Sequence, residues 1–148
     1  MPRIRFVALA LMIALGAPTA AVGAAQYVEV AVAAAILFDA PSDKANKRFI
    51  VTESTPLEVL SSLPPWTKVR DADGSVSWIR AGELRDASHL LAVSTATVRA
   101  APADASAARF RVARGVLLER VGEARGGWVE VRHQGTAGFV RAEDVWGL

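Results

Sequence analysis

Cysteine is absent from the 148-residue chain, and histidine occurs only twice. Without cysteine there is no disulfide, no thiolate nucleophile, no cysteine-ligated metal and no lipid-modified N-terminal cysteine. Two histidines alone do not make a structural zinc site. Neither histidine has an acid or a nucleophile at a recognisable catalytic spacing. We therefore expect a protein that is not an enzyme and has no cofactor and no metal.

Other motifs that would indicate catalysis or ion binding are lacking as well. His89 lies between the two halves of the chain and His133 lies at a turn, so both are interpreted as ordinary surface residues. Residues 71–74 begin like a calcium loop, but their glycine is at the fourth place instead of the sixth. No glycine-rich phosphate loop is present. A hydrolase is the least supported interpretation.

A hydrophobic run long enough to span a membrane is also missing. The run Phe6–Leu15 has about ten residues, whereas a spanning helix needs about 20. Arg3 and Arg5 precede it and small residues follow, which is the pattern of a secretory signal peptide. Cleavage after Ala24 or Ala25 fits best, and a retained anchor is the alternative. Residues 1–25 are predicted to direct the protein to the periplasm or outside the cell.

A basic surplus disappears once this segment is set aside. The chain has 17 basic and 15 acidic residues, but two of the basic residues lie in the signal peptide. The remainder therefore has 15 of each sign. A polyphosphate partner needs a basic surplus or patch, so we expect no nucleic-acid binding.

The chain lacks helical periodicity and repeats itself at an offset of 61 residues. Residues 35–60 align with 96–121 without a gap, including Arg-Phe-x-Val at 48–51 and 109–112. Trp66-x-x-Val-Arg70 then aligns with Trp128-x-x-Val-Arg132, and turn residues follow each segment. Short segments rich in β-branched residues indicate small barrels or sandwiches. We predict two copies of one all-β unit, at 26–88 and 89–148.

The second copy resembles the bacterial SH3 (SH3b) domain family. The matching motifs are Thr97-Val-Arg-x-x-Pro102, Gly127-Trp-Val-x-Val-Arg132 and Gly135-x-x-Gly-Phe-Val140. The first copy is more divergent but keeps the same framework. The resemblance implies two tandem SH3-like β-barrels of five to six strands each, preceded by the signal peptide. It also implies a non-catalytic binding module of an exported bacterial protein.

Alternation along the strands predicts which side chains face outward. Val69, Val129 and Val131 are expected inside, because the opposite face of each strand carries charges that a core does not hold cheaply. The tryptophans are therefore expected to point outward and form an exposed strip with arginines. The SH3 resemblance adds Phe38 to this face. The predicted binding residues are Phe38, Trp66, Arg70, Trp78, Arg80, Trp128, Arg132, Phe139 and Arg141.

Two interpretations of this aromatic and arginine face remain open. In one, it binds a peptide-like or peptidoglycan-like ligand or an envelope protein. Arg80 and Arg141 replace the proline of SH3 grooves that bind proline-rich peptides, and so favour a polar or carboxylate-bearing chain. In the other, the faces pack between the two barrels or on another subunit, with no small ligand. Trp146 is expected to pack across a barrel mouth.

Overall fold

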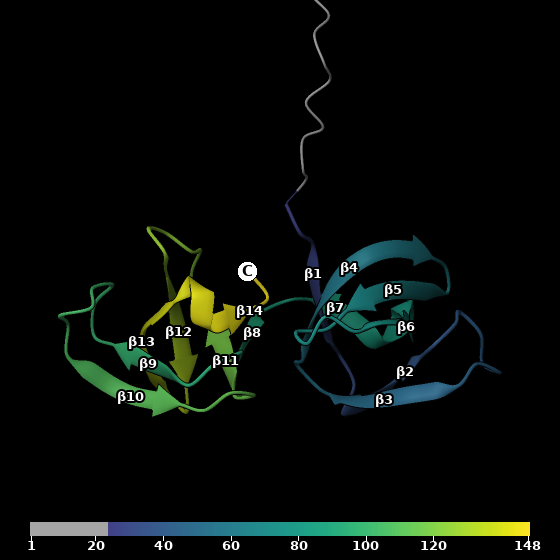
Figure 1. The fold of residues 1–148 in the computed structure, drawn as a ribbon, viewed down its shortest axis with the longest axis horizontal. Coiled ribbons are helices and arrows are strands. Elements are labelled where there is room, and N and C mark those ends of the chain that lie inside the picture. The colour runs from purple at the N-terminus through teal and green to yellow at the C-terminus, as the bar shows by residue number, and fades with distance from the viewer. Residues whose placement is uncertain (1–23) are drawn as a thin grey trace, which may run out of the picture.

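The computed structural model describes residues 24–148, and the predicted signal peptide lies almost wholly outside them. Figure 1 shows two β-domains side by side, joined by one crossing of the chain. Strands of the first domain are β1 (Tyr27–Val30), β2 (Ala34–Phe38), β3 (Lys47–Thr52), β4 (Pro56–Leu63), β5 (Trp66–Arg70), β6 (Val76–Arg80) and β7 (Leu84–Asp86). Strands of the second are β8 (His89–Ala92), β9 (Ala96–Arg99), β10 (Ala108–Val112), β11 (Leu117–Arg120), β12 (Trp128–His133), β13 (Thr136–Arg141) and β14 (Val145–Trp146).

The two domains have the same topology. The first sheet has the order β3-β2-β6-β5-β4-β1-β7, and the second has the equivalent order β10-β9-β13-β12-β11-β8-β14. All paired strands are antiparallel, and a 3₁₀ turn (Ala81–Glu83 or Ala142–Asp144) precedes each last strand. The prediction of two tandem all-β domains is confirmed. Each sheet has seven strands where the family resemblance implied five to six, because the short first and last strands of each domain, β1 with β7 and β8 with β14, also pair.

Each domain has its own hydrophobic core, and the valines predicted to face inward lie in these cores. Val69 and Ile79 lie in the first core, and Val129, Val131 and Val140 lie in the second. Alternation places these residues on one face of each strand. Neither Trp66 nor Trp128 belongs to a core cluster, so the tryptophans lie on the opposite face.

One position in the barrel differs between the domains. In the second domain β13 crosses β9 so closely at Gly138 that a Cβ there would lie 2.6 Å from Val98 Cγ1 and 2.7 Å from the Arg99 carbonyl oxygen. The equivalent residue of β6 is Ser77, which is buried and whose hydroxyl has no hydrogen-bond partner among residues 24–148. The first domain therefore accommodates a side chain that the second has no room for.

A buried carboxylate joins the end of the first domain to the start of the second. Glu29 in β1 has no exposed surface. Its oxygens accept hydrogen bonds from Arg85 Nε (2.7 Å) and from the backbone N–H groups of Ser88 (2.8 Å) and His89 (2.9 Å). His89 Nδ1 lies 3.1 Å from the same carboxylate. The interpretation of His89 as an ordinary surface residue is therefore wrong: it is half-buried beside Glu29, across the domain boundary.

Burial favours a raised pKa for Glu29, but the hydrogen bonds from Ser88, Arg85 and His89 outweigh it and hold the pKa below its usual range. Trp146 adds an apolar contact to this junction. Its ring meets Tyr27 of the first domain edge to face, with the centroids 5.3 Å apart. Trp146 thus packs across the domain boundary and not only on the barrel that contains it.

Candidate ligand-binding face

A tryptophan, an arginine and an aspartate are stacked in the same way in both domains. In the first domain the Arg80 guanidinium lies 5.0 Å from the ring centre of Trp66 and is paired with Asp43. In the second domain Arg141 lies 4.7 Å from the ring centre of Trp128 and is paired with Asp104. Each aspartate comes from the long loop of the first hairpin (39–46 or 100–107), which therefore folds over the tryptophan strand.

These stacks correct the expectation of a fully exposed aromatic strip. Trp66 is 6% exposed and Trp128 is 8% exposed, because an arginine covers each indole from outside. Phe38 also meets Trp66 edge to face, with ring centres 5.3 Å apart, and is buried itself. These neighbours belong to the same domain as the tryptophan. The two indoles are therefore covered within their own domains, which does not favour the interpretation that they pack between the barrels.

The stacks also change the chemistry expected of the arginines. Each guanidinium already has a carboxylate partner in the folded domain. A ligand carboxylate at Arg80 or Arg141 would have to share the guanidinium with Asp43 or Asp104. Recognition of a carboxylate-bearing chain by these two arginines is therefore not what the geometry favours.

Two predicted aromatic residues keep part of their surface open. Trp78 and Phe139 are half-buried and occupy equivalent places on β6 and β13. Directly across the strand pair, Lys68 faces Trp78 and its Nζ lies 5.8 Å from the ring centre. The residue across from Phe139 is Glu130. A cation therefore covers the aromatic ring in the first domain, and a carboxylate stands at that place in the second.

A groove of about 320 Å³ opens on this face of the second domain. Trp128 and Phe139 supply its aromatic side, and Pro102 comes from the first hairpin loop. Glu123 and Glu130 contribute two carboxylates and Arg125 one guanidinium. The sequence indicated Trp128 and Phe139 as binding residues but not the others. The glycine turn that precedes Trp128 was the only signal for the loop containing Glu123 and Arg125.

Arg70 and Arg132 stand apart from the aromatic residues. Each is directly opposite a glutamate on the neighbouring strand, and the ion pairs are Arg70–Glu58 (3.0 Å) and Arg132–Glu119 (3.1 Å). Arg132 lines a cleft at the domain boundary and does not line the groove. The structure thus brings together Phe38, Trp66 and Arg80 in one domain, and Trp128, Phe139 and Arg141 in the other, but separates the remaining arginines from them.

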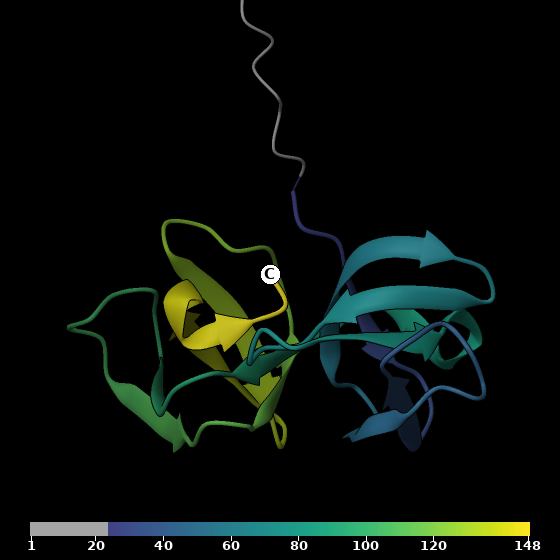
Figure 2. The same ribbon diagram turned by 45° about the vertical axis from the view of Figure 1, so that its right-hand side comes forward.

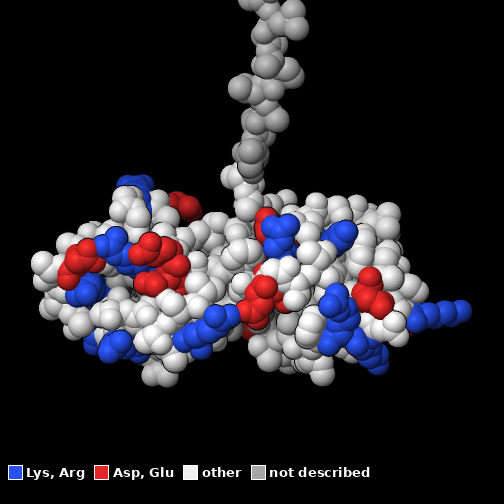
Figure 3. Space-filling view, in the orientation of Figure 1, with Lys and Arg blue, Asp and Glu red and all other residues white. Residues whose placement is uncertain are grey.

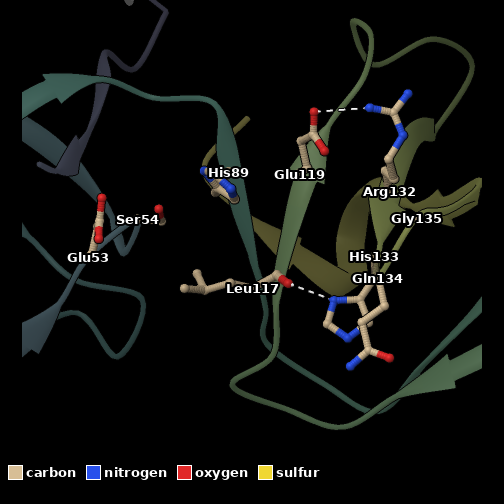
Figure 4. A pocket seen from close by; sticks show the side chains of 9 residues that line it. All are labelled: Glu53, Ser54, His89, Leu117, Glu119, Arg132, His133, Gln134 and Gly135. Carbon is tan, nitrogen blue, oxygen red and sulfur yellow. Dashed lines mark hydrogen bonds and ion pairs between the residues drawn. The ribbon is translucent and has the colours of Figure 1, made fainter. Parts of the chain in front are cut away.

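The cleft at the domain boundary holds about 390 Å³ and is shown in Figure 4. Glu53 and Ser54 of the first domain face His89 and the Glu119–Arg132 pair of the second. His133 Nδ1 lies 3.2 Å from the carbonyl oxygen of Leu117, which requires a proton on that nitrogen. Within residues 24–148, no three histidine, aspartate or glutamate side chains are grouped so that they could hold a metal ion.

The family model for the bacterial SH3 domain matches residues 31–86 and 92–147. The chain belongs to the bacterial SH3 domain family. Both copies are matched, including the divergent first one, and domains of this family are typically binding modules. No helix within residues 24–148 has the length and apolar character to cross a bilayer.

No curated protein matches the chain. Similar solved structures include NlpC1 from Trichomonas vaginalis (11% identity, TM-score 0.40, 91% of this chain and 50% of that one). NlpC2 from the same organism has 12% identity and a TM-score of 0.39, over 82% of this chain and 48% of that one. An NlpC/P60 family protein from Bacillus cereus has 14% identity and a TM-score of 0.39, over 82% of this chain and 56% of that one. The chain spans about half the length of these proteins, and likeness at this level carries no inference about function.

Proposed function

We propose that the protein is a non-catalytic, exported binding protein whose second domain holds a peptide-like ligand in the groove beside Trp128 and Phe139. The ligand class is a peptide of the cell wall or a peptide segment of an envelope protein. The predicted signal peptide supports a periplasmic or secreted location. The observation that carries the proposal is the groove itself, where aromatic, acidic and basic side chains converge.

The chemistry of the groove indicates a ligand that carries an amino group. Phe139 and Trp128 offer apolar surface to an aliphatic chain. Glu123 and Glu130 supply two carboxylates that attract an ammonium group, and Arg125 can pair with a carboxylate of the same ligand. Peptides of peptidoglycan carry both groups, so they are the first ligands to test.

The first domain is the weaker candidate for the same role. Its two tryptophans already have cations on them, with Arg80 over Trp66 and Lys68 over Trp78. A ligand ammonium group would meet Lys68 where the second domain offers Glu130. We therefore assign the ligand to the second domain and a supporting role to the first.

The test is calorimetric titration with soluble muropeptides, together with pull-down on intact cell walls. Phe139→Ala should weaken binding by about tenfold or more, because it removes one aromatic wall. Trp78→Ala is the matched change in the first domain, because Trp78 occupies the place of Phe139, and it should leave binding unchanged. Absence of binding to both wall and fragments by the unmodified protein removes the cell-wall form of the proposal. Equal binding by Phe139→Ala removes the groove as the site.

A further inference from the structure

The first domain ends in a free apolar sheet edge. Strand β3 is the last strand of its sheet and, in the part of the chain that the structure describes, pairs only with β2. Ile50 is 75% exposed and Phe49 is 42% exposed. In both views of the ribbon, β3 forms the lower margin of the first domain (Figures 1 and 2). Edge strands with apolar surface pair readily with other strands unless charges or prolines protect them.

The hydrogen-bond pattern shows which backbone groups of this edge point outward. The N–H of Glu53 donates to the carbonyl of Ala33, at 3.3 Å, so Glu53 turns its backbone groups toward the neighbouring strand. Antiparallel ladders alternate residue by residue. Ile50 and Thr52 therefore present their N–H and C=O groups away from β2, where another strand could bind.

The equivalent edge of the second domain is protected. Strand β10 is also the last in its sheet, but Arg111 takes the place of Ile50 and is exposed. Phe110, the counterpart of Phe49, packs against the core of its domain. Charged residues on an edge strand oppose pairing with another chain. Of the two edge strands β3 and β10, we therefore expect only β3 to pair with another chain.

We propose that two copies of the protein associate through β3, in an antiparallel pair with Ile50 at the two-fold axis. This register sets Ile50 opposite Ile50 of the second copy, so that their outward backbone groups exchange hydrogen bonds. Thr52 then lies opposite Arg48 of the second copy, and Phe49 lies beside Val51. The apolar side chains of the edge are covered by their own counterparts.

The charges of the strand favour a second copy over another partner. Lys47 and Arg48 stand at the start of β3, and Glu53, an exposed carboxylate that also pairs with Arg85 (3.1 Å), follows its end. An antiparallel pair brings the basic end of one strand to the acidic end of the other, and Lys47 meets Glu53 twice. Figure 3 shows basic side chains at the lower right of the molecule, with an acidic side chain between them, and further acidic side chains towards the domain junction. The edge is thus complementary to itself.

Sedimentation velocity over the micromolar range tests this association. The unmodified protein should pass from monomer to dimer as its concentration rises. Ile50→Arg, which gives the first domain the residue of the second domain's edge, should raise the dissociation constant by about tenfold or more. Leu63→Arg is the matched control, because Leu63 is an exposed apolar residue at the end of β4, outside this edge. It should leave the dimer intact.

A charge exchange tests the register independently of the apolar contact. Lys47→Glu and Glu53→Lys should each weaken the dimer, and the double variant should restore it. Hydrogen exchange should show the amide of Ile50 protected only at high concentration. A protein that stays monomeric over the whole range, or an Ile50→Arg variant as dimeric as the unmodified protein, overturns the proposal. Dimerisation with no rescue by the double variant overturns the antiparallel register.

Discussion

Lys68 of the first domain and Glu130 of the second occupy the same place beside an aromatic ring, with opposite charge. The cation lies over Trp78, whereas the carboxylate opposite Phe139 lines an open groove. One side chain therefore changes what the same barrel face can attract. Duplication supplied two equivalent faces, and the charge at this position separates the proposed binding domain from the supporting one.

The tryptophan–arginine–aspartate stacks, in contrast, are the same in both domains. The stack of Trp66 under Arg80 has its counterpart in Trp128 under Arg141, and both arginines are paired with aspartates. A cation over a ring contributes about 0.5–1 kcal/mol at exposed sites and more where water is excluded. Such stacks stabilise the loop over the barrel. We assign the arginines and aspartates of these stacks to the framework of the domain, and of the stacked residues Trp128 also lines the groove.

The largest expected effect of a single substitution is at the domain junction, where the two domains differ in charge. Glu29 lies beside Arg85 on β1 and β7, whereas the equivalent strands of the second domain place Leu91 beside Trp146. Glu29→Leu should lower the free energy of unfolding by about 3 kcal/mol, because Arg85 and two backbone N–H groups lose their acceptor. Urea unfolding measures it. A loss below about 0.5 kcal/mol contradicts this role.

Acid should act on the same carboxylate. Because the pKa of Glu29 is lowered in the folded protein, its contribution to stability is present above the ordinary carboxyl pKa of 4.5 and is lost as the pH falls through the lowered value. We expect the free energy of unfolding to fall below about pH 4.5, with a shallower fall in Glu29→Gln. Parallel pH profiles for the two proteins contradict this assignment.

The position shared by Gly138 and Ser77 gives the next largest effect. Gly138→Ala should destabilise the second domain by about 2 kcal/mol, because the added Cβ meets a backbone carbonyl oxygen at 2.7 Å that no rotamer change can relieve. Thermal unfolding followed by tryptophan fluorescence reports the change. An unchanged midpoint shows that β13 can move away from β9.

Ser77→Ala is the matched change in the first domain and should have the smallest effect. Within the described part of the chain the buried Ser77 hydroxyl has no hydrogen-bond partner, so its removal should be neutral or stabilising by up to about 1 kcal/mol. The same thermal unfolding experiment measures it. Destabilisation similar to that of Gly138→Ala would show that the two positions are under the same packing constraint.

The repeated Trp-x-x-Val-Arg segments were sufficient to predict two β-domains, and alternation along them placed Val69 and Val129 inside. The burial of Trp66 was not predictable in this way, because it depends on Arg80, and the aspartate that holds Arg80 over the ring, Asp43, is 37 residues from Arg80 in the sequence. The Glu29 cluster was missed for the same reason. Its partners are 56 to 60 residues away, and nothing local in β1 marks a buried carboxylate.

The contacts of Trp146 and the charged residues of the groove also depend on tertiary structure that the sequence pattern does not show. Trp146 was expected to pack at a barrel mouth, and its contact with Tyr27 depends on how the two domains meet. Glu123 and Arg125 sit in a loop whose sequence indicates only a turn. The sequence therefore predicted which strands carry the aromatic residues, while the charges around them depended on loop positions.

The most direct test is an NMR titration with a muropeptide, which follows the indole N–H signals of the four tryptophans. The account predicts that Trp128 shifts on binding while Trp66 and Trp78 stay in place, and that Glu130→Lys abolishes the shift. Movement of the Trp78 signal with no change at Trp128 would contradict the assignment of the ligand to the second domain.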